Sequence, residues 1–264
     1  MNWDCVGAHL LNVTFGDGPL FYLSPAHLQV PGKPARGGVP VMFPQFANKG
    51  SGPKHGLVRQ QVWTCVSETD AAASFTLNLR PDPKQMWFGH AQVTLSASLT
   101  PACDSGPACF SMTYRVENAG AEVFDFTGGL HPYFRVDDVR QFALHGLNEV
   151  DFEDRYGASD LPVPGFLHGQ AFERLYLNAP AIVLTDGVIR LKISAQGFDN
   201  WMVWNPGAEL ALGLPDMPPQ DWQRFVCVEP IVAAKPMVLA PGACFVGTMR
   251  VERVVSGFAG HRLD

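Results

Sequence analysis

Proline and glycine divide the chain into many short segments, and within these segments apolar and polar residues alternate. The 264 residues include 22 prolines and 26 glycines, and no part of the sequence shows a long helical period. The alternation is clearest in residues 91–100 and 108–118. A period of two residues turns one face of a strand to a core and the other to solvent, which is typical of antiparallel sheets. The pattern therefore predicts an all-β chain.

Strands are expected in residues 9–15, 19–24, 61–67, 73–80, 91–100, 108–118, 121–126, 141–146, 181–185, 188–194, 201–205, 224–229 and 243–255. Residues 101–107 and the Asp186-Gly187 dipeptide are expected to be hairpin turns, and residues 218–223 a short helical turn. About a dozen strands or more would fill two large curved sheets packed face to face, with room for a cleft. The sequence has no repeat or linker, so a single domain is expected over residues 1–264.

The composition narrows the functional class. With 47% hydrophobic and 17% charged residues, the chain can bury a sizeable core. A formal net charge of -6 argues against general nucleic-acid binding. No apolar stretch approaches the length of a membrane span, and the first residues lack the pattern of a signal peptide. The six cysteines form no CxxC pair, so free thiols in a reducing cytoplasm are expected.

Motifs of several other protein classes are absent. The sequence has no GxSxG, no GxGxxG and no Walker A run, and none of the eight histidines lies in an HxH or HExxH pattern. We therefore expect no metal ion. Nothing marks a coiled coil or an obligate interface, so a monomer is the default expectation.

The segment from Pro31 to Arg59 is basic and rich in glycine and proline. No Asp or Glu occurs from residue 18 through residue 67. Glycines let backbone N–H groups approach a ligand, and arginines offer planar forks that suit phosphate or carboxylate. The segment therefore indicates an anion site, although a solvated basic surface would give the same charge count. Its basic and imidazole side chains are Lys33, Arg36, Lys49, Lys54, His55 and Arg59.

Two residues far down the chain are candidates for acid/base chemistry. Glu229 follows the apolar run 225–228 and precedes a proline, as though at the end of a strand. A buried carboxylate there would have a raised pKa and could serve as a base near neutrality, whereas a Glu turned to solvent would not. His131 lies in the run 128–134, which reads GGLHPYF and is expected to be a shaped loop. It could transfer protons or be a core histidine bonded to backbone.

These pieces, in their order along the chain, resemble the aldose 1-epimerase superfamily, and most closely its glucose-6-phosphate 1-epimerase branch. The resemblance extends from about residue 10 to residue 250. As a set the motifs are specific, whereas any one alone would be weak. The matching pieces are Arg36–Pro40, Phe43–Phe46, His55–Arg59, His131–Phe134, Glu173–Tyr176, Val203–Pro206 and Phe225–Pro230.

The resemblance implies a β-supersandwich fold, no cofactor, and a hexose 6-phosphate as substrate. It implies that His131 is the general acid and Glu229 the general base, and that Arg36 and Arg59 contact the phosphate. His55 follows a further phosphate contact that is commonly Gln in that branch and is Lys54 here. This change adds positive charge and could alter which sugar phosphate fits.

Glu173 is a second departure from the family pattern. It stands where the pattern has an Asp that binds a sugar hydroxyl, and it is one methylene longer. Two other functions fit the sequence less well. An aldose 1-epimerase for neutral sugars would not need the basic cluster, and a non-catalytic sugar-phosphate sensor would not need both His131 and Glu229.

Overall fold

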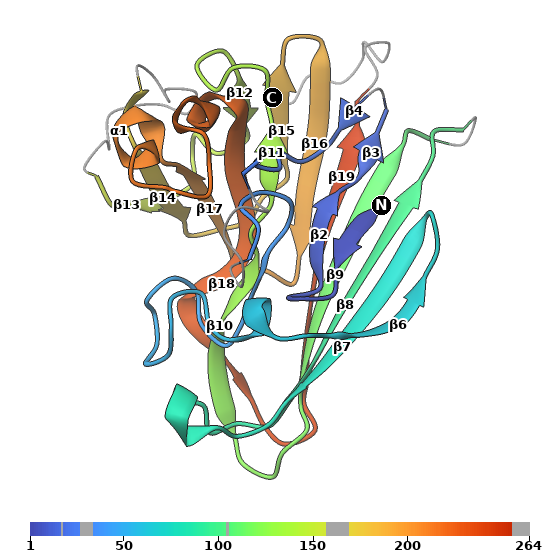
Figure 1. The fold of residues 1–264 in the computed structure, drawn as a ribbon, viewed down its shortest axis with the longest axis vertical. Coiled ribbons are helices and arrows are strands. Elements are labelled where there is room, and N and C mark those ends of the chain that lie inside the picture. The colour runs from blue at the N-terminus through green and yellow to red at the C-terminus, as the bar shows by residue number, and fades with distance from the viewer. Residues whose placement is uncertain (17, 27–33, 104–105, 157–168, 255–264) are drawn as a thin grey trace.

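Two large antiparallel sheets make up most of the protein, as seen in a computed structural model that describes residues 1–16, 18–26, 34–103, 106–156 and 169–254. In Figure 1 one sheet lies to the left and the other to the right. The seven-stranded sheet has the order β13 (Phe152–Asp154), β14 (Phe172–Tyr176), β17 (Asn200–Asn205), β18 (Phe225–Leu239), β10 (Phe124–Leu130) and β5 (Val41–Met42), and β11 (Tyr133–Arg135) also pairs with β18.

The second sheet has eight strands and contains the longest regular hairpin. Its order is β12 (Ala143–His145), β15 (Ile182–Asp186), β16 (Ile189–Gln196), β19 (Cys244–Arg253), β9 (Cys109–Asn118), β8 (Ala91–Thr100), β7 (Ala72–Leu79) and β6 (Thr64–Glu68). Two small two-stranded sheets pair β1 (Asn2–Asp4) with β2 (His9–Asn12) and β3 (Thr14–Phe15) with β4 (Gly18–Pro19). The prediction of an all-β fold with two large sheets is confirmed.

Helical structure is confined to short turns in the described part of the chain. They are α1 (Gly207–Ala211) and the 3₁₀ turns at Val58–Gln60, Pro83–Gln85 and Pro219–Arg224. The last of these lies where the sequence predicted a helical turn. None of the helices in the described ranges has the length and apolar character needed to cross a membrane.

The main core lies between the two sheets, and its pattern was visible in the sequence. On β8 and β9 every second side chain is buried, including Val93, Leu95, Phe110 and Met112. The hydroxyl of Tyr114, which is fully buried, donates to the Met42 carbonyl at 3.4 Å and so joins β9 to β5 in the other sheet. The period of two therefore predicted the core face of these strands correctly.

Two strands are longer than the sequence predicted, and both corrections concern the candidate site. β18 continues through Pro230 as far as Leu239, so Glu229 lies inside a strand and not at its end. β10 includes Gly128 and Gly129, so only His131 and Pro132 interrupt the pairing of the predicted loop. Because β18 has paired neighbours on both sides, tertiary pairing overrides the local proline and glycine signals.

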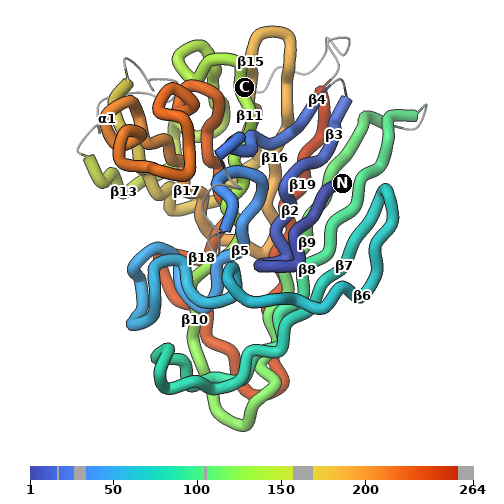
Figure 2. The backbone as a smooth tube through the Cα atoms, viewed as in Figure 1, coloured from blue at the N-terminus to red at the C-terminus, as the bar shows by residue number. Residues whose placement is uncertain are grey.

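The basic segment follows the edge of this seven-stranded sheet. β5 pairs with β10, and Phe43 bridges to Gly56 in the loop that follows. In Figure 2 the segment from residue 34 to residue 60, in blue, loops beside β10 and β18 before the chain crosses to β6 in the other sheet. The basic residues are thus brought next to His131, which follows β10, and Glu229, which lies on β18.

Position 129, where β10 packs on β18, has no room for a side chain. A Cβ atom at this position would collide with the carbonyl oxygen of Pro230, the residue that follows Glu229. The φ angle of 145° is also one that other residues rarely adopt. Any side chain at position 129 would therefore push the two strands apart beside the candidate base.

We predict that Gly129→Ala lowers the free energy of unfolding by about 3 kcal/mol or more, because it combines backbone strain with a backbone collision. Gly187→Ala is the matched control, since Gly187 also has a positive φ but no other atom lies within 4 Å of the place that a Cβ would take there. That control should lose about 1 kcal/mol. Urea unfolding of both variants measures the difference, and equal losses would contradict the close packing of β10 on β18.

Candidate active site

A cavity of about 290 Å³ opens on the face of the seven-stranded sheet that is turned away from the main core. β18 explains this placement. Its side chains alternate, so Val226 and Val228 enter the main core while Glu229 and Ile231 lie on the other face. Ile231 packs there in a small separate apolar cluster with Met42, Phe46, Leu175, Met202 and Ala233.

Strand register sets the side chains on this face of the sheet in two rows. Residues that face each other across paired strands lie on the same face of a sheet. One row runs Glu173, Trp204, Cys227 and Tyr133, and the next runs Leu175, Met202 and Glu229. Glu173 and Glu229, which are far apart in sequence, thus lie on one surface only because β17 pairs with both β14 and β18.

His131 and Glu229 form a close, buried pair. The distance from His131 Nε2 to Glu229 Oε1 is 3.4 Å, and the two side chains are 11% and 2% exposed. His131 Nδ1 and Glu229 Oε2 have no hydrogen-bond partner among the described residues. Buried polar atoms without partners are rare and often mark a site where a ligand completes the bonding.

Aromatic rings hold the imidazole of His131 in place. It stacks on the Tyr133 ring with a centroid distance of 4.9 Å, and the rings of His55 and Trp204 lie beside it at steep angles. The His131 backbone N–H donates to the Pro40 carbonyl at 2.9 Å. The orientation of the ring is therefore fixed from the side chains around it and from the main chain.

Burial shifts both members of the pair towards their neutral forms. It raises the pKa of Glu229 well above its ordinary value, with a smaller contribution from the charge of Glu173. It lowers the pKa of His131 well below its ordinary value, assisted by His55, Arg59 and Arg36. In the free protein the pair therefore favours a protonated carboxyl and a neutral imidazole. One exchangeable proton is thus held at the floor of the cavity.

Three positive side chains of the basic segment line the same cavity. Arg36 donates to both oxygens of Asp216, at 2.8 and 3.1 Å, and to the Tyr133 hydroxyl at 3.4 Å. Arg59 is half-buried, and its buried Nε has no partner among the described residues. Desolvation lowers the pKa of this guanidinium. Lys54 is exposed at the cavity. An anion that accepted the donors of Arg59 would relieve a buried polar group.

His55 adds a neutral donor beside these cations. Its Nδ1 accepts the Ala47 N–H at 3.3 Å, which leaves the proton on Nε2. Burial, with smaller contributions from the three neighbouring positive charges, lowers the pKa of His55 to about 3. At neutral pH this imidazole is therefore uncharged and can donate one hydrogen bond.

Glu173 reaches the cavity from β14, where it is paired with Arg155. The Arg155 guanidinium donates to both carboxylate oxygens, at 3.0 and 3.1 Å. Behind this pair, Arg174 is buried, bonds Asp154 at 3.0 Å and stacks on the Phe152 ring. The two ion pairs fix β13 to β14 and so hold Glu173 at the cavity wall.

All seven residues predicted for the site line this one cavity: Arg36, Lys54, His55, Arg59, His131, Glu173 and Glu229. Lys49 from the same basic segment lines a different cavity, and Lys33 lies outside the described residues. The positive side chains at this cavity therefore come from only part of the basic segment.

Several side chains at the cavity were not predicted as site residues. Asp216 and Arg155 carry no local motif, and they enter the site through ion pairs to Arg36 and Glu173. Tyr133 and Trp204 belonged to matching pieces of sequence, but only strand register shows that they share a row with Glu173. A correct prediction of how β14, β17 and β18 pair would have placed these two side chains at the site.

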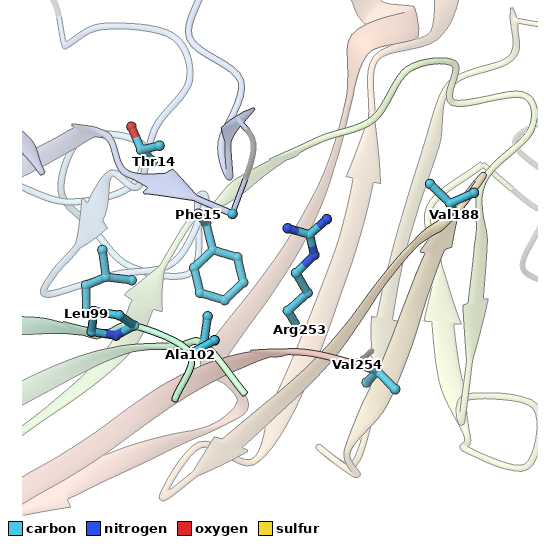
Figure 3. A pocket seen from close by; sticks show the side chains of 10 residues that line it. Thr14, Phe15, Leu99, Ala102, Val188, Arg253 and Val254 are labelled. Atoms are coloured by element: carbon cyan, nitrogen blue, oxygen red, sulfur yellow. The ribbon is translucent and has the colours of Figure 1, made fainter. Parts of the chain in front are cut away.

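A second cavity, of about 560 Å³, is larger but is lined mainly by apolar side chains. Figure 3 shows Thr14, Phe15, Leu99, Ala102, Val188, Arg253 and Val254 around it. Arg253 is the one charged side chain among its described lining residues. Without an acid/base pair, this cavity is the weaker candidate for chemistry.

We predict a pH dependence of stability that is due to His55. Since its folded pKa of about 3 lies below the unfolded value near 6.5, the unfolded chain binds the proton first. This contribution to stability is complete above about pH 6.5 and is lost as the pH falls towards 3. His55→Asn, which tolerates the positive φ at this position, should make unfolding less pH-dependent by up to about 1 kcal/mol per pH unit. Urea unfolding between pH 4 and 7 measures this, and parallel curves would contradict it.

Comparison with known proteins gives a consistent result. A family model described as Aldose 1-epimerase matches residues 6–252. A protein of Cenchrus ciliaris, with the provisional name glucose-6-phosphate 1-epimerase, is 27% identical over 93% of this chain and 78% of its own length. A protein of Escherichia coli K12 with the same provisional name is 28% identical over 87% of this chain and 78% of its own length.

Solved structures share the fold. A provisionally named mutarotase from Salmonella typhimurium has a TM-score of 0.78 at 24% identity, over 96% of this chain and 86% of its own. A provisionally named aldose 1-epimerase from Escherichia coli K12 has a TM-score of 0.68 at 16% identity, over 95% of this chain and 94% of its own. Since the family model spans nearly the whole sequence, the chain belongs to the aldose 1-epimerase family.

Proposed function

We propose that the protein is a hexose-6-phosphate 1-epimerase, with glucose 6-phosphate as the expected substrate. The observation that carries this proposal is the joint occurrence, in one cavity, of a buried acid/base pair and a set of positive side chains. The pair is His131 and Glu229, and the positive side chains include Arg36, Lys54 and Arg59. Relatives provisionally named glucose-6-phosphate 1-epimerase support the same substrate.

The reaction needs two proton transfers. Glu229 removes the proton of the C1 hydroxyl while His131 protonates the ring oxygen, so the bond between C1 and the ring oxygen breaks and an open-chain aldehyde forms. Rotation about the C1–C2 bond then presents the other face of the aldehyde. The same two residues return the protons in reverse as the ring closes, and the pair ends as it began.

The negative charge of a phosphate ester would shift the pKa of His131 in the direction that these proton transfers need. In the free cavity the positive charges of Arg59 and Arg36 help to lower the pKa of His131. A bound phosphate ester would neutralise these charges and raise the pKa of His131 towards its ordinary value. Arg36 and Arg59 act on His131 whereas Lys54 acts on Glu229, so a phosphate held mainly by the two arginines would raise the pKa of the imidazole more than that of the carboxyl. The imidazole could then hold the proton that it gives to the ring oxygen, and Glu229 could act as the base. The phosphate would thus orient the sugar ring and also raise the pKa of the general acid, His131.

Other side chains of the cavity suit the rest of a sugar. The neutral His55 offers a donor and Glu173 offers acceptors for ring hydroxyls. Met202 and Trp204 supply an apolar wall for the carbon face of the ring. Because Glu173 is already bonded to Arg155, its contact with a hydroxyl would have to share the carboxylate with that guanidinium.

The two alternatives differ in measurable ways. An epimerase for neutral sugars would have no use for the buried, unpaired Nε of Arg59. A non-catalytic sensor would bind the phosphate ester without accelerating anomer exchange. The proposal also covers assembly, partners and location. It includes a monomer, no nucleic-acid partner and a location in the cytoplasm. The six free cysteines, which form no disulfide, fit a reducing compartment.

Anomer exchange tests the proposal directly. NMR magnetisation transfer between the α and β signals would be recorded for glucose 6-phosphate and for glucose with catalytic amounts of protein. We expect acceleration for the phosphate ester that far exceeds any acceleration for glucose. Equal rates would favour a neutral-sugar epimerase, and binding without acceleration would favour the sensor.

We predict that Glu229→Gln abolishes turnover and leaves binding of glucose 6-phosphate largely intact. The amide keeps the shape of the side chain but cannot accept the C1 proton. The exchange rate should fall by at least about 100-fold, while the dissociation constant from calorimetry changes little. Near-normal turnover in this variant would remove Glu229 from the role of base.

We also predict that Arg59→Met raises the KM for glucose 6-phosphate by about ten- to 100-fold, since a hydrogen bond to a charged group is worth about 1.5–3 kcal/mol. Lys49→Met is the matched control, because Lys49 lies in the same basic segment but lines a different cavity. It should leave KM unchanged. A similar rise in both variants would mean that general charge, and not a phosphate contact, is responsible.

A further inference from the structure

Three potential metal ligands from different parts of the sequence meet at and directly beneath the cavity, which His131 and Glu229 line and Cys227 does not. One ligand atom each of His131, Cys227 and Glu229 lie within 4.8 Å of one another, and all three residues are buried. Cys227 and Glu229 are two apart on β18, so both project to the same face, and His131 follows β10. The motif search could not find this group because His131 and Cys227 are far apart in the sequence.

The spacing of the acid/base pair suits a bridging ion. The 3.4 Å between His131 Nε2 and Glu229 Oε1 is long for a hydrogen bond. It is close to the separation of roughly 3.3–3.5 Å that two ligands have when they bind one tetrahedral zinc ion at about 2.0–2.1 Å. The unpartnered Oε2 of Glu229 is a second independent sign that a ligand is missing from this bonding pattern.

The ligand types select a class of metal. A thiol, an imidazole and a carboxylate are together typical of zinc and similar borderline ions, whereas magnesium and calcium prefer oxygen alone. Three protein ligands leave the fourth tetrahedral position to a water molecule from the cavity. Binding of the ion requires a neutral imidazole and would release the proton of the thiol.

We propose that His131, Cys227 and Glu229 form a site for Zn²⁺ or a similar thiophilic divalent cation, and that occupation of this site inhibits the enzyme. The ion would bind the lone pairs with which Glu229 and His131 accept protons. It would therefore compete with the sugar and is not a cofactor of the reaction. The inhibition rests on the function proposed above, whereas the binding of the ion does not.

Cobalt(II) is a suitable probe because thiolate ligation gives it a charge-transfer absorption in the near ultraviolet. We expect this band in the wild-type protein at one equivalent of Co²⁺, and we expect Zn²⁺ to displace it. Cys227→Ala should lose the band. Cys109→Ala is the matched control, because Cys109 is also buried but lies on β9 in the other sheet, and it should keep the band.

Inhibition gives the second readout. Cys227 takes no part in the proposed proton transfers, so Cys227→Ala should retain anomer exchange without metal. Loss of an outer-shell partner already weakens metal binding by about 10–100-fold, so loss of this ligand should raise the inhibition constant for Zn²⁺ by at least about 100-fold. Cys109→Ala should be inhibited like the wild type.

The outcomes are distinct. Cobalt binding without a thiolate band, or equal inhibition of wild type and Cys227→Ala by Zn²⁺, would overturn the proposed site. If Cys227→Ala does not fold, Cys227→Ser replaces it as the test, because it keeps the size of the side chain but offers no thiolate. A cobalt band that Cys227→Ser retains would overturn the proposal. A cobalt band in a protein that turns over no sugar phosphate would support the metal site while contradicting the proposed function.

Discussion

The pairing of β18 with strands on both sides is the constraint on which the site depends. This strand runs through the middle of the seven-stranded sheet, and its alternation separates Val226 and Val228, in the main core, from Glu229 on the cavity face. β10 can lie close enough only because position 129 is glycine. A carboxylate is thereby buried in the centre of a sheet, where desolvation would be unfavourable without a function that uses it.

The same burial explains the electrostatics of the cavity. Glu229 and His131 favour their neutral forms because water is excluded from them, and the guanidinium of Arg59 is also disfavoured by burial. Arg36 is compensated by Asp216, but Arg59 has an unpartnered Nε. An anionic substrate would supply the missing charge. Phosphate recognition and acid/base chemistry are thus coupled through one desolvated space.

The sequence predicted the fold class, the main core strands and seven residues that line one cavity. Local alternation was sufficient for β8 and β9, since each has a half-buried face. It failed at Pro230 and Gly128, where the pairing of neighbouring strands decides the structure. It also missed β13 and β14, whose pattern is obscured by a buried Asp154–Arg174 ion pair. Asp216, Arg155 and the grouping of Cys227 with His131 depend on contacts across strands and loops, which no local motif encodes.

The most direct measurement of the central claim is a crystal structure with an unreactive sugar phosphate, such as the 1-deoxy analogue of glucose 6-phosphate. The ring oxygen should lie within hydrogen-bond distance of His131, and C1 should face Glu229. The phosphate should accept hydrogen bonds from Arg36 and Arg59, with Lys54 beside it. A phosphate bound at the His131–Glu229 pair, or a sugar bound in the cavity near Arg253, would contradict the assignment of the two ends of the site.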